Sequence, residues 1–159
     1  MEYGPRSLGN RSILYHAKDT NVNDWLNKRL KRTEFMPFAP SSLFEKYTEL
    51  YVGLEKSEEA EKFMTISCPV TDKMAEACPA AVHVDGTARP QLVDSERNPS
   101  FHKILIEYEK LSGIGCVINT SFNMHEEPIV CTPNDAVRVF LDGKLDYLAI
   151  GNYIVQSKQ

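Results

Sequence analysis

The sequence lacks several patterns that would assign a chain of this size to a known class of protein. Its four cysteines form no Cys-x-x-Cys pair, which disfavours a zinc ribbon or a thioredoxin-type site. It contains no run of about 18 apolar residues, so it predicts no membrane-spanning helix and no membrane partner. The absence of Gly-x-x-x-x-Gly-Lys-Ser/Thr and of Gly-x-Ser-x-Gly excludes a P-loop and a hydrolase nucleophile elbow.

The chain also lacks an excess of basic residues. Its 18 Lys and Arg face 22 Asp and Glu, which gives a formal net charge of −4 and argues against a nucleic-acid partner. The charge is unevenly distributed, because residues 1–36 carry seven Lys/Arg and four Asp/Glu. Such a local excess fits either solvated helix faces or a site for a small anion, and both interpretations stay open.

Three of the four cysteines lie in apolar stretches. These residues are Cys68, Cys116 and Cys131. We expect them to be buried, reduced thiols that pack as small hydrophobic side chains. A reducing cytoplasm fits that expectation.

What the sequence does contain is one domain's worth of alternating helix and strand patterns. A length of 159 residues with 42% hydrophobic residues is enough for a single core, so we expect one domain over residues 1–159 of α/β or α+β class. The clearest helices are predicted over 99–112, between Asn98-Pro99 and Gly113, and over 133–141, where Thr132, Pro133 and Asp135 form a start signal.

The remaining elements rest on weaker signals. Thr20 is expected to cap a helix that runs to about residue 32. Strands are predicted over 63–68 and 114–118, and near 147–150 and 153–155. A hairpin is predicted over 80–93, with its strands at 80–84 and 90–93 joined by the turn Asp85-Gly86.

Four polar segments interrupt this pattern, at residues 4–12, 28–40, 83–89 and 119–123. The first has two glycines and two arginines within nine residues, which suits phosphate or carboxylate binding. A plain turn with its arginines paired to Glu2 or Asp19 is about equally compatible. The second is the basic end of a helix, where the helix dipole alone favours cations.

The third and fourth segments differ in how strongly they indicate a site. His83 and Asp85 stand two residues apart, but no third ligand is evident, so a hydrogen-bonded histidine is favoured over a metal site. Residues 119–123 (Asn-Thr-Ser-Phe-Asn) follow a buried strand, at the position where open α/β sheets place ligand-binding groups. Together the segments supply cationic and amide donors without an evident nucleophile, which suits chemistry on phosphates by positioning and charge neutralisation.

These segments, in this order, resemble the C-terminal domain of the O-carbamoyltransferases, the family of nodulation-factor and antibiotic carbamoyltransferases. The resemblance runs nearly end to end. It rests on residues 2–14 (Glu-Tyr-Gly-Pro-Arg-Ser-Leu-Gly-Asn-Arg-Ser-Ile-Leu), 37–41 (Pro-Phe-Ala-Pro-Ser), 83–89 (His-Val-Asp-Gly-Thr-Ala-Arg), 119–123 and 127–130 (Glu-Pro-Ile-Val).

The resemblance implies a fold and an activity. The fold would be YrdC-like, a twisted open mixed sheet flanked by helices around a basic central cavity. The activity would be formation of carbamoyl-adenylate from carbamoyl phosphate and ATP, with Mg accompanying ATP and no metal bound by this domain. Transfer to a hydroxyl acceptor would occur in an N-terminal Kae1-like domain, which we expect to be absent from this chain because residues 1–3 resemble internal family sequence.

The resemblance also assigns roles to residues. Lys31, Arg89 and Ser121 are the expected catalytic residues. Substrate and nucleotide binding is expected from a wider set, namely Arg6, Arg11, Lys31, Arg89, Asn119, Thr120, Ser121 and Asn123. Arg11 and Asn123 have the alternative of holding their own loops. Two family arginines are replaced here by Thr33 and Met36.

Two non-catalytic interpretations remain beside the enzyme. The chain could be a nucleotide- or anion-binding module without chemistry of its own. It could also be a structural half that completes the site of the other domain. We expect Lys31, Arg89 and Ser121 to line one cavity, because each is a donor at the end of a predicted element with no evident local partner.

Overall fold

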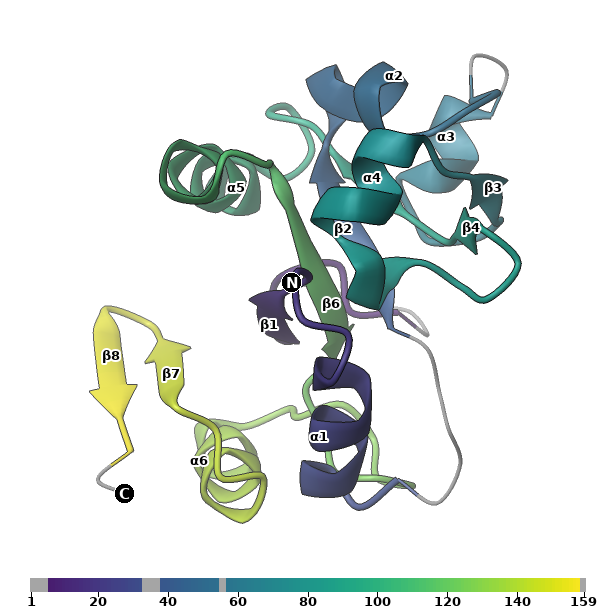
Figure 1. Cartoon of the computed structure of the whole chain (residues 1–159). Coiled ribbons are helices and arrows are strands. Elements are labelled where there is room, and N and C mark those ends of the chain that lie inside the picture. The colour runs from purple at the N-terminus through teal and green to yellow at the C-terminus, as the bar shows by residue number, and fades with distance from the viewer. Residues whose placement is uncertain (1–5, 33–37, 55–56, 158–159) are drawn as a thin grey trace.

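The computed structural model describes residues 6–32, 38–54 and 57–157, and Figure 1 shows the arrangement of the elements. The helices are α1 Val22–Arg29, α2 Tyr47–Leu50, α3 Glu58–Glu61, α4 Asp72–Ala77, α5 Pro99–Ser112 and α6 Pro133–Asp142, with short 3₁₀ turns η1 Phe44–Lys46 and η2 Pro79–Ala81. The strands are β1 Ser12–His16, β2 Ala39–Leu43, β3 Cys68–Pro69, β4 Thr87–Ala88, β5 Gln91–Val93, β6 Cys116–Ser121, β7 Tyr147–Ile150 and β8 Tyr153–Gln156.

A four-stranded mixed sheet in the order β1-β6-β2-β5 forms the centre of the fold. Strand β6 runs antiparallel to both neighbours, with Ser121 opposite Ser12 on β1 and Asn119 opposite Ala39 on β2. Strands β2 and β5 are parallel, with Ser41 beside Gln91. The expected mixed α/β sheet flanked by helices is therefore present.

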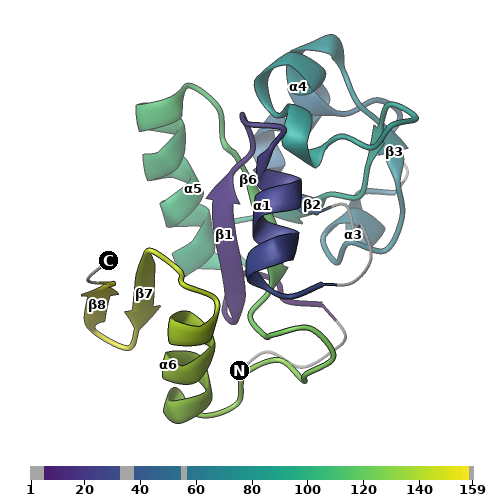
Figure 2. The same cartoon turned by 60° about the horizontal axis from the view of Figure 1, so that its bottom comes forward.

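The two faces of this sheet are covered by different helices. On one face, Leu43, Val93 and Val117 pack beneath Phe101 and Leu105 of α5. The other face belongs to the larger core, in which Ile118 and Cys116 share a cluster with residues of α1, α4 and α6. Figure 2 shows α1 and α5 on different sides of β1. Because side chains alternate along a strand, residues two apart on β6 face the same helix.

The helices with strong local start signals form as predicted. The Asn98 side chain accepts from Phe101 N, and α5 ends at Gly113 in the left-handed conformation. At α6, Thr132 and Asp135 form the reciprocal bonds of a capping box. The expected Thr20 cap is wrong, because α1 begins at Val22 and Asn21 occupies its N-cap position without a side-chain bond.

Two strand predictions in the middle of the chain are wrong. Residues 63–68 form a strand only at its end, where β3 begins at Cys68, because Met64 adopts a left-handed backbone angle (φ 56°). The hairpin predicted over 80–93 does not form either. Its turn closes locally through a bond from His83 N to Thr87 O (2.7 Å), and β5 pairs with β2 instead.

The cysteine expectation holds for Cys68 and Cys116, which are buried. Cys78 is buried as well, although its sequence context gave no such indication. Cys131 contradicts the expectation because it is exposed, directly before the N-cap of α6. No disulfide links the described cysteines.

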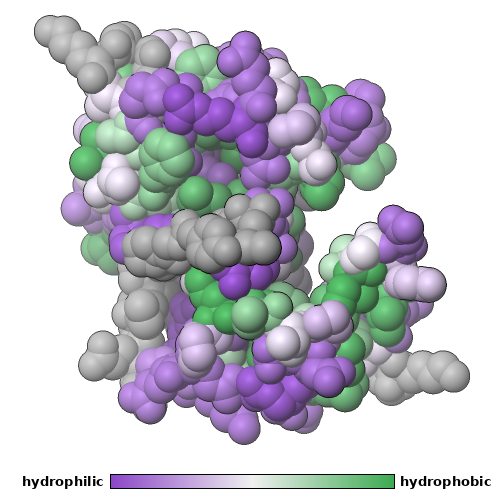
Figure 3. Space-filling model, turned by 180° about the vertical axis from the view of Figure 1, so that it is seen from behind, coloured by the Kyte–Doolittle hydropathy of each residue, from purple (hydrophilic) through white to green (hydrophobic). Residues whose placement is uncertain are grey.

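The C-terminal hairpin β7–β8 stands apart from the central sheet. Tyr153 and Ile154 on β8 are 75% and 80% exposed. Figure 3 shows the apolar side chains of this hairpin on one wall of an open cleft, with the upper part of the molecule as the other wall. Among the described helices, none is long and apolar enough to cross a membrane.

Candidate functional site

The sheet topology brings the four polar segments to one end of the sheet. Strands β1, β2 and β5 begin at the end where β6 finishes, as the pairs Ser12–Ser121, Ala39–Asn119 and Ser41–Gln91 show. The described parts of the polar segments are residues 6–12 before β1, residues 28–32 and 38–40 before β2, residues 83–89 before β5, and residues 119–123 at the end of β6. Segments more than one hundred residues apart in sequence therefore converge at this end of the sheet, which we call the polar end.

Two arginines at the polar end lie near each other without an acidic partner. Arg89 is partly buried two residues before β5, and burial lowers the pKa of its guanidinium, with the charge of nearby Arg6 lowering it further. Neither arginine forms a hydrogen bond or ion pair within the described part of the chain. Two neighbouring cations without a carboxylate provide a favourable place for an anion.

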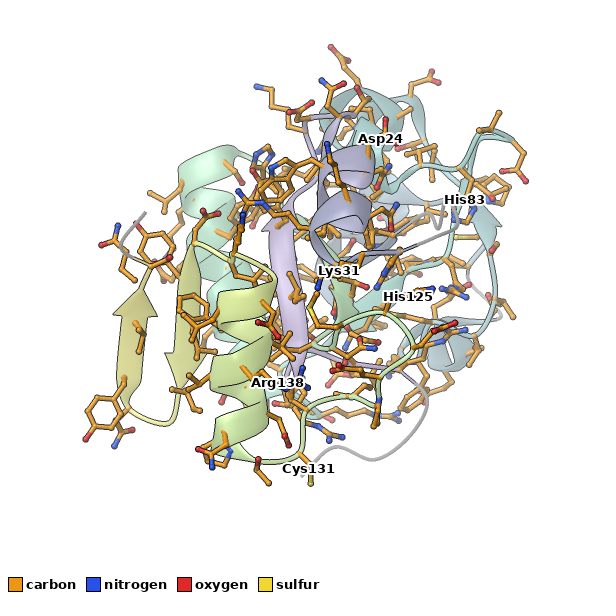
Figure 4. All side chains as sticks on the ribbon, turned by 90° about the horizontal axis from the view of Figure 1, so that it is seen from below. Asp24, Lys31, His83, His125, Cys131 and Arg138 are labelled. Atoms are coloured by element: carbon orange, nitrogen blue, oxygen red, sulfur yellow. The ribbon has the colours of Figure 1, made fainter. Side chains whose placement is uncertain are left out.

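The third expected cation, Lys31, lies at the end of α1. It is exposed, and its left-handed backbone (φ 57°) turns the chain out of the helix. The pKa of Glu127 is lowered chiefly by its bonds to Arg138, and Lys31 contributes to that shift, so Lys31 lies near the 121–131 loop. Figure 4 shows Lys31 beside the part of that loop that carries His125, whose backbone N donates to Leu30 O (3.1 Å).

The end of β6 presents its polar side chains to both faces of the sheet. Asn119 and Ser121 share the α5 face with Val117, whereas Thr120 shares the opposite face with Ile118. Thr120 Oγ1 accepts a hydrogen bond from Arg32 Nη2 (2.9 Å). The segment therefore links the α1 side of the molecule to the α5 side.

Arg32 is the residue at the polar end that the sequence analysis did not assign. If α1 continued through residue 32, the Arg32 side chain would point away from the polar end. Instead α1 ends at Arg29, and the left-handed backbone of Lys31 changes the direction of the chain. Its guanidinium lies 5.0 Å from the centre of the Phe38 ring, and burial lowers its pKa. A positive φ at a lysine cannot be read from sequence, so no sequence signal identified this contact. Thr33 and Met36 lie outside the described residues.

Asn123 bonds within its own loop, whereas Arg11 ties the loop before β1 to the loop that follows β6. Arg11 Nη1 donates to Val130 O (3.1 Å), and Asn123 Nδ2 donates to the carbonyls of Met124 (2.9 Å) and Glu127 (2.7 Å). Because those carbonyls accept only, the amide orientation of Asn123 is fixed. Its Oδ1 is buried and receives no hydrogen bond from any residue that the structure describes.

The loop before β1 is tightly built. Ser7 Oγ donates to Arg11 O (2.6 Å), and Gly9 adopts φ 109°. A Cβ at Gly9 would lie 2.3 Å from the Phe101 ring, so a larger residue would collide with the first turn of α5.

His83 is held by its own turn. Its Nδ1 lies 2.9 Å from Thr87 Oγ1, and Asp85 accepts from both the backbone N and the hydroxyl of Thr87. The favoured hydrogen-bonded histidine is thus present. The described residues contain no group of three His, Cys, Asp or Glu side chains placed to hold a metal ion.

A cavity of about 240 Å³ lies beside the polar end, with Leu8, Asn10 and Gln91 in its wall. Its charged residues are Lys62, Asp94 and Arg97, so it is of mixed charge. Lys31, Arg89 and Ser121 are not among the residues that line this cavity, so the expectation that they share one stays a prediction. Strand pairing places Arg89, just before β5, and Ser121, at the end of β6, at the same end of the sheet.

The chain belongs to the carbamoyltransferase family. The family described as "Carbamoyltransferase C-terminus" matches residues 1–157. An uncharacterized protein of Methanocaldococcus jannaschii is 43% identical over 159 residues, covering 99% of this chain and 26% of that protein. Nodulation protein NolNO of Sinorhizobium fredii is 39% identical over 158 residues, covering 99% of this chain and 23% of NolNO. The chain thus spans about a quarter of the length of the curated relatives it matches.

A solved structure shares the fold. Full-length HypF, crystallised in its phosphate- and nucleotide-bound form, superposes with a TM-score of 0.59 at 20% sequence identity. The superposition covers 82% of this chain and 16% of HypF. The mixed α/β fold of this chain therefore also occurs in a solved structure.

Proposed function

We propose that this chain is the part of an O-carbamoyltransferase that binds carbamoyl phosphate and ATP and forms carbamoyl-adenylate. The observation that carries the proposal is that Arg6 and Arg89 lie near each other at the polar end of the sheet, where β6 ends, with no acidic partner among the described residues. Membership of the carbamoyltransferase family narrows the anion to carbamoyl phosphate. The phosphate- and nucleotide-bound form of HypF supports the two ligand classes.

The proposed reaction has two balanced steps. Water cleaves carbamoyl phosphate to carbamate and inorganic phosphate. A carbamate oxygen then attacks the α-phosphorus of ATP, the bond to the β-phosphate oxygen breaks, and pyrophosphate leaves as carbamoyl-adenylate forms. Negative charge develops on phosphoryl oxygens in both steps, so cations aimed at those oxygens lower the barrier.

The proposed roles follow from charge and position. Arg6, Arg89 and Lys31 neutralise phosphate oxygens, and the two guanidinium groups bind them bidentately. Ser121 and Thr120 orient oxygens at the end of β6, with Thr120 held by Arg32. Arg11 and Asn123 support the loop that carries these groups. Mg accompanies ATP as its counter-ion.

The test is pyrophosphate formation from ATP by the purified chain, with and without carbamoyl phosphate. Formation that depends on carbamoyl phosphate supports adenylation. Replacement of two family arginines by Thr33 and Met36 favours weak triphosphate binding, and therefore an anion-binding module as the second candidate. A rise in melting temperature with ligand, but no pyrophosphate formation, would support that module. If neither effect is seen, the chain is a structural half of the enzyme.

Transfer to an acceptor is proposed to require a second, Kae1-like domain. Activation of a hydroxyl needs a base or a metal, and the described residues contain no cluster that would hold a metal. We expect no carbamoylated product when the chain is supplied with ATP, carbamoyl phosphate and an aminoglycoside. Catalytic appearance of the added carbamoyl mass would refute the division of the two steps between domains.

A further inference from the structure

Three buried polar side chains form a hydrogen-bonded cluster inside the α5 face of the sheet. Ser41, Gln91 and Asn119 lie on three adjacent strands and are 0%, 3% and 2% exposed. Two residues away on the same strands are Leu43, Val93 and Val117, which pack against α5, so the cluster continues that face toward the polar end. We call it the Ser41–Gln91–Asn119 cluster.

The direction of each amide in this cluster is fixed by a backbone carbonyl. Leu8 O can only accept, and it receives Gln91 Nε2 at 2.9 Å. Gln91 must therefore present Oε1 to the cluster, where it accepts from Ser41 Oγ (2.7 Å) and Asn119 Nδ2 (3.0 Å). Asn119 Nδ2 also donates to Ser41 Oγ (3.0 Å), so both of its N–H groups are used.

This arrangement leaves one strong acceptor without a donor. Asn119 Oδ1 is buried and has no hydrogen-bond partner among the described residues. A buried carbonyl of this kind destabilises the folded chain unless a donor reaches it. Asn119 lies two residues before Ser121 on the same face of β6, at the strand end where Arg6 and Arg89 converge.

We propose that Gln91 is a positioning residue that holds Asn119 Oδ1 ready to accept a hydrogen bond from the N–H of a carbamoyl group. The inference rests on the proposed function and adds the basis on which the site would distinguish a carbamoyl group from other acyl groups. A carbamoyl group differs from an acetyl group of nearly the same shape by an NH₂ in place of a CH₃. Only the NH₂ can satisfy the acceptor, so the cluster selects carbamoyl phosphate over acyl phosphates.

The first experiment needs no variant. Two stable phosphonates serve as probes, phosphonoacetamide and acetonylphosphonate, which differ only in NH₂ against CH₃. Their affinities and that of inorganic phosphate are measured by calorimetry with the full chain, at a pH where both phosphonates are dianions. We expect phosphonoacetamide to bind about tenfold more tightly than acetonylphosphonate, the effect of one buried hydrogen bond.

The second experiment removes the positioning residue. Gln91→Leu releases the Asn119 amide, and the ratio of the two phosphonate affinities should fall to about one while the affinity for inorganic phosphate stays the same. Ser42→Ala is the matched control. Ser42 is also buried, on β2, the strand that pairs with the strand of Gln91, but it faces the other side of the sheet and its hydroxyl pairs with Tyr51 Oη (2.5 Å). That variant should keep the tenfold ratio.

The outcomes separate the inference from the proposed function. Failure of phosphate and both phosphonates to bind would overturn the proposed function and this inference with it. Binding of both phosphonates with equal affinity by the unaltered chain would overturn only the inference, whether or not Gln91→Leu folds. Purine riboside triphosphate lacks the 6-amino group of ATP. If the chain discriminates between these two nucleotides but not between the phosphonates, Asn119 Oδ1 accepts from adenine, and the inference is also overturned.

Discussion

The two ends of strand β6 are built from opposite kinds of residue. At its beginning, Cys116 and Ile118 are fully buried, and an added Cβ on Gly115 would lie 2.4 Å from Leu43 Cδ1. At its end, within the part of the chain that the structure describes, Asn119 has a buried oxygen without a donor, and two arginines nearby have no acidic partner. The first end stabilises the fold, whereas the second holds groups that cost stability, which is typical of a ligand site.

The largest expected effect is at the apolar end. Ile118→Ala should lower the free energy of unfolding by about 2–5 kcal/mol, because it removes a fully buried side chain and leaves a cavity. Thr120→Ala, two residues along the same face, should cost only about 1 kcal/mol, since it removes one hydrogen bond to Arg32. Urea denaturation of both variants measures the difference. Equal losses would contradict the contrast between the two ends.

The next effect concerns binding at the polar end. Arg89→Glu should weaken phosphate and carbamoyl phosphate binding by at least about a hundredfold, close to 3 kcal/mol, because it reverses a charge at an anion site. The melting temperature should change little, since Arg89 forms no bond within the described residues. Lys103→Glu makes the same change of charge on the exposed side of α5 and should leave affinity unchanged. Unaltered binding by Arg89→Glu would make Arg89 an ordinary surface arginine.

The contrast between regions also explains which elements the sequence predicts. Helices α5 and α6 follow from residues within one turn of their ends, such as Asn98 and Gly113 or Thr132 and Asp135. Strand β5 pairs with β2, fifty residues earlier in sequence, and no local pattern encodes that pairing. Its true neighbour therefore could not be predicted, and the local turn Asp85-Gly86 led to the wrong hairpin.

The candidate site was only partly accessible from sequence for the same reason. Clusters of Arg, Asn and Ser drew attention to residues 4–12 and 119–123, and the fold brings those segments to one end of the sheet. The contact of Arg32 with Thr120 depends on a backbone reversal at Lys31. The unpaired oxygen of Asn119 depends on Leu8 O, more than one hundred residues away, and Gln91 lies outside the four segments.

A buried acid on α3, outside the four polar segments, tests whether the polar end is special. Glu61 of α3 is 0% exposed, and neither of its carboxylate oxygens has a hydrogen-bond partner among the described residues. Burial raises its pKa to about 7, and its charge in turn helps to raise the pKa of buried Cys68. The unfolded chain ionises Glu61 near its ordinary value of 4.5, so the folded state loses stability as the pH rises from there to about 7.

Glu61→Gln should remove that loss. At about pH 8 the variant should be more stable than the unaltered chain by about 2–3 kcal/mol, and the two should be nearly equal below about pH 4.5. Urea denaturation across this pH range gives the measurement, and phosphate affinity should not change. If the variant is more stable but binds phosphate more weakly, Glu61 belongs to the functional site, and the polar end is not the only region that trades stability for binding.

The smallest expected effects come from removing two helix caps. Asn98 caps α5 at the polar end, and Thr132 caps α6 away from it. Thr132→Ala removes the hydroxyl that accepts from Asp135 N (3.2 Å) and should cost about 1 kcal/mol of stability. Asn98→Ala removes a similar cap on α5, but Asn98 Nδ2 also donates to Leu8 O (2.9 Å), the carbonyl that orients Gln91. Only Asn98→Ala should therefore weaken binding of phosphonoacetamide, by a few-fold, beyond its cost in stability. Denaturation and calorimetry on both variants decide the point, since equal affinities would mean that Leu8 O is held without Asn98.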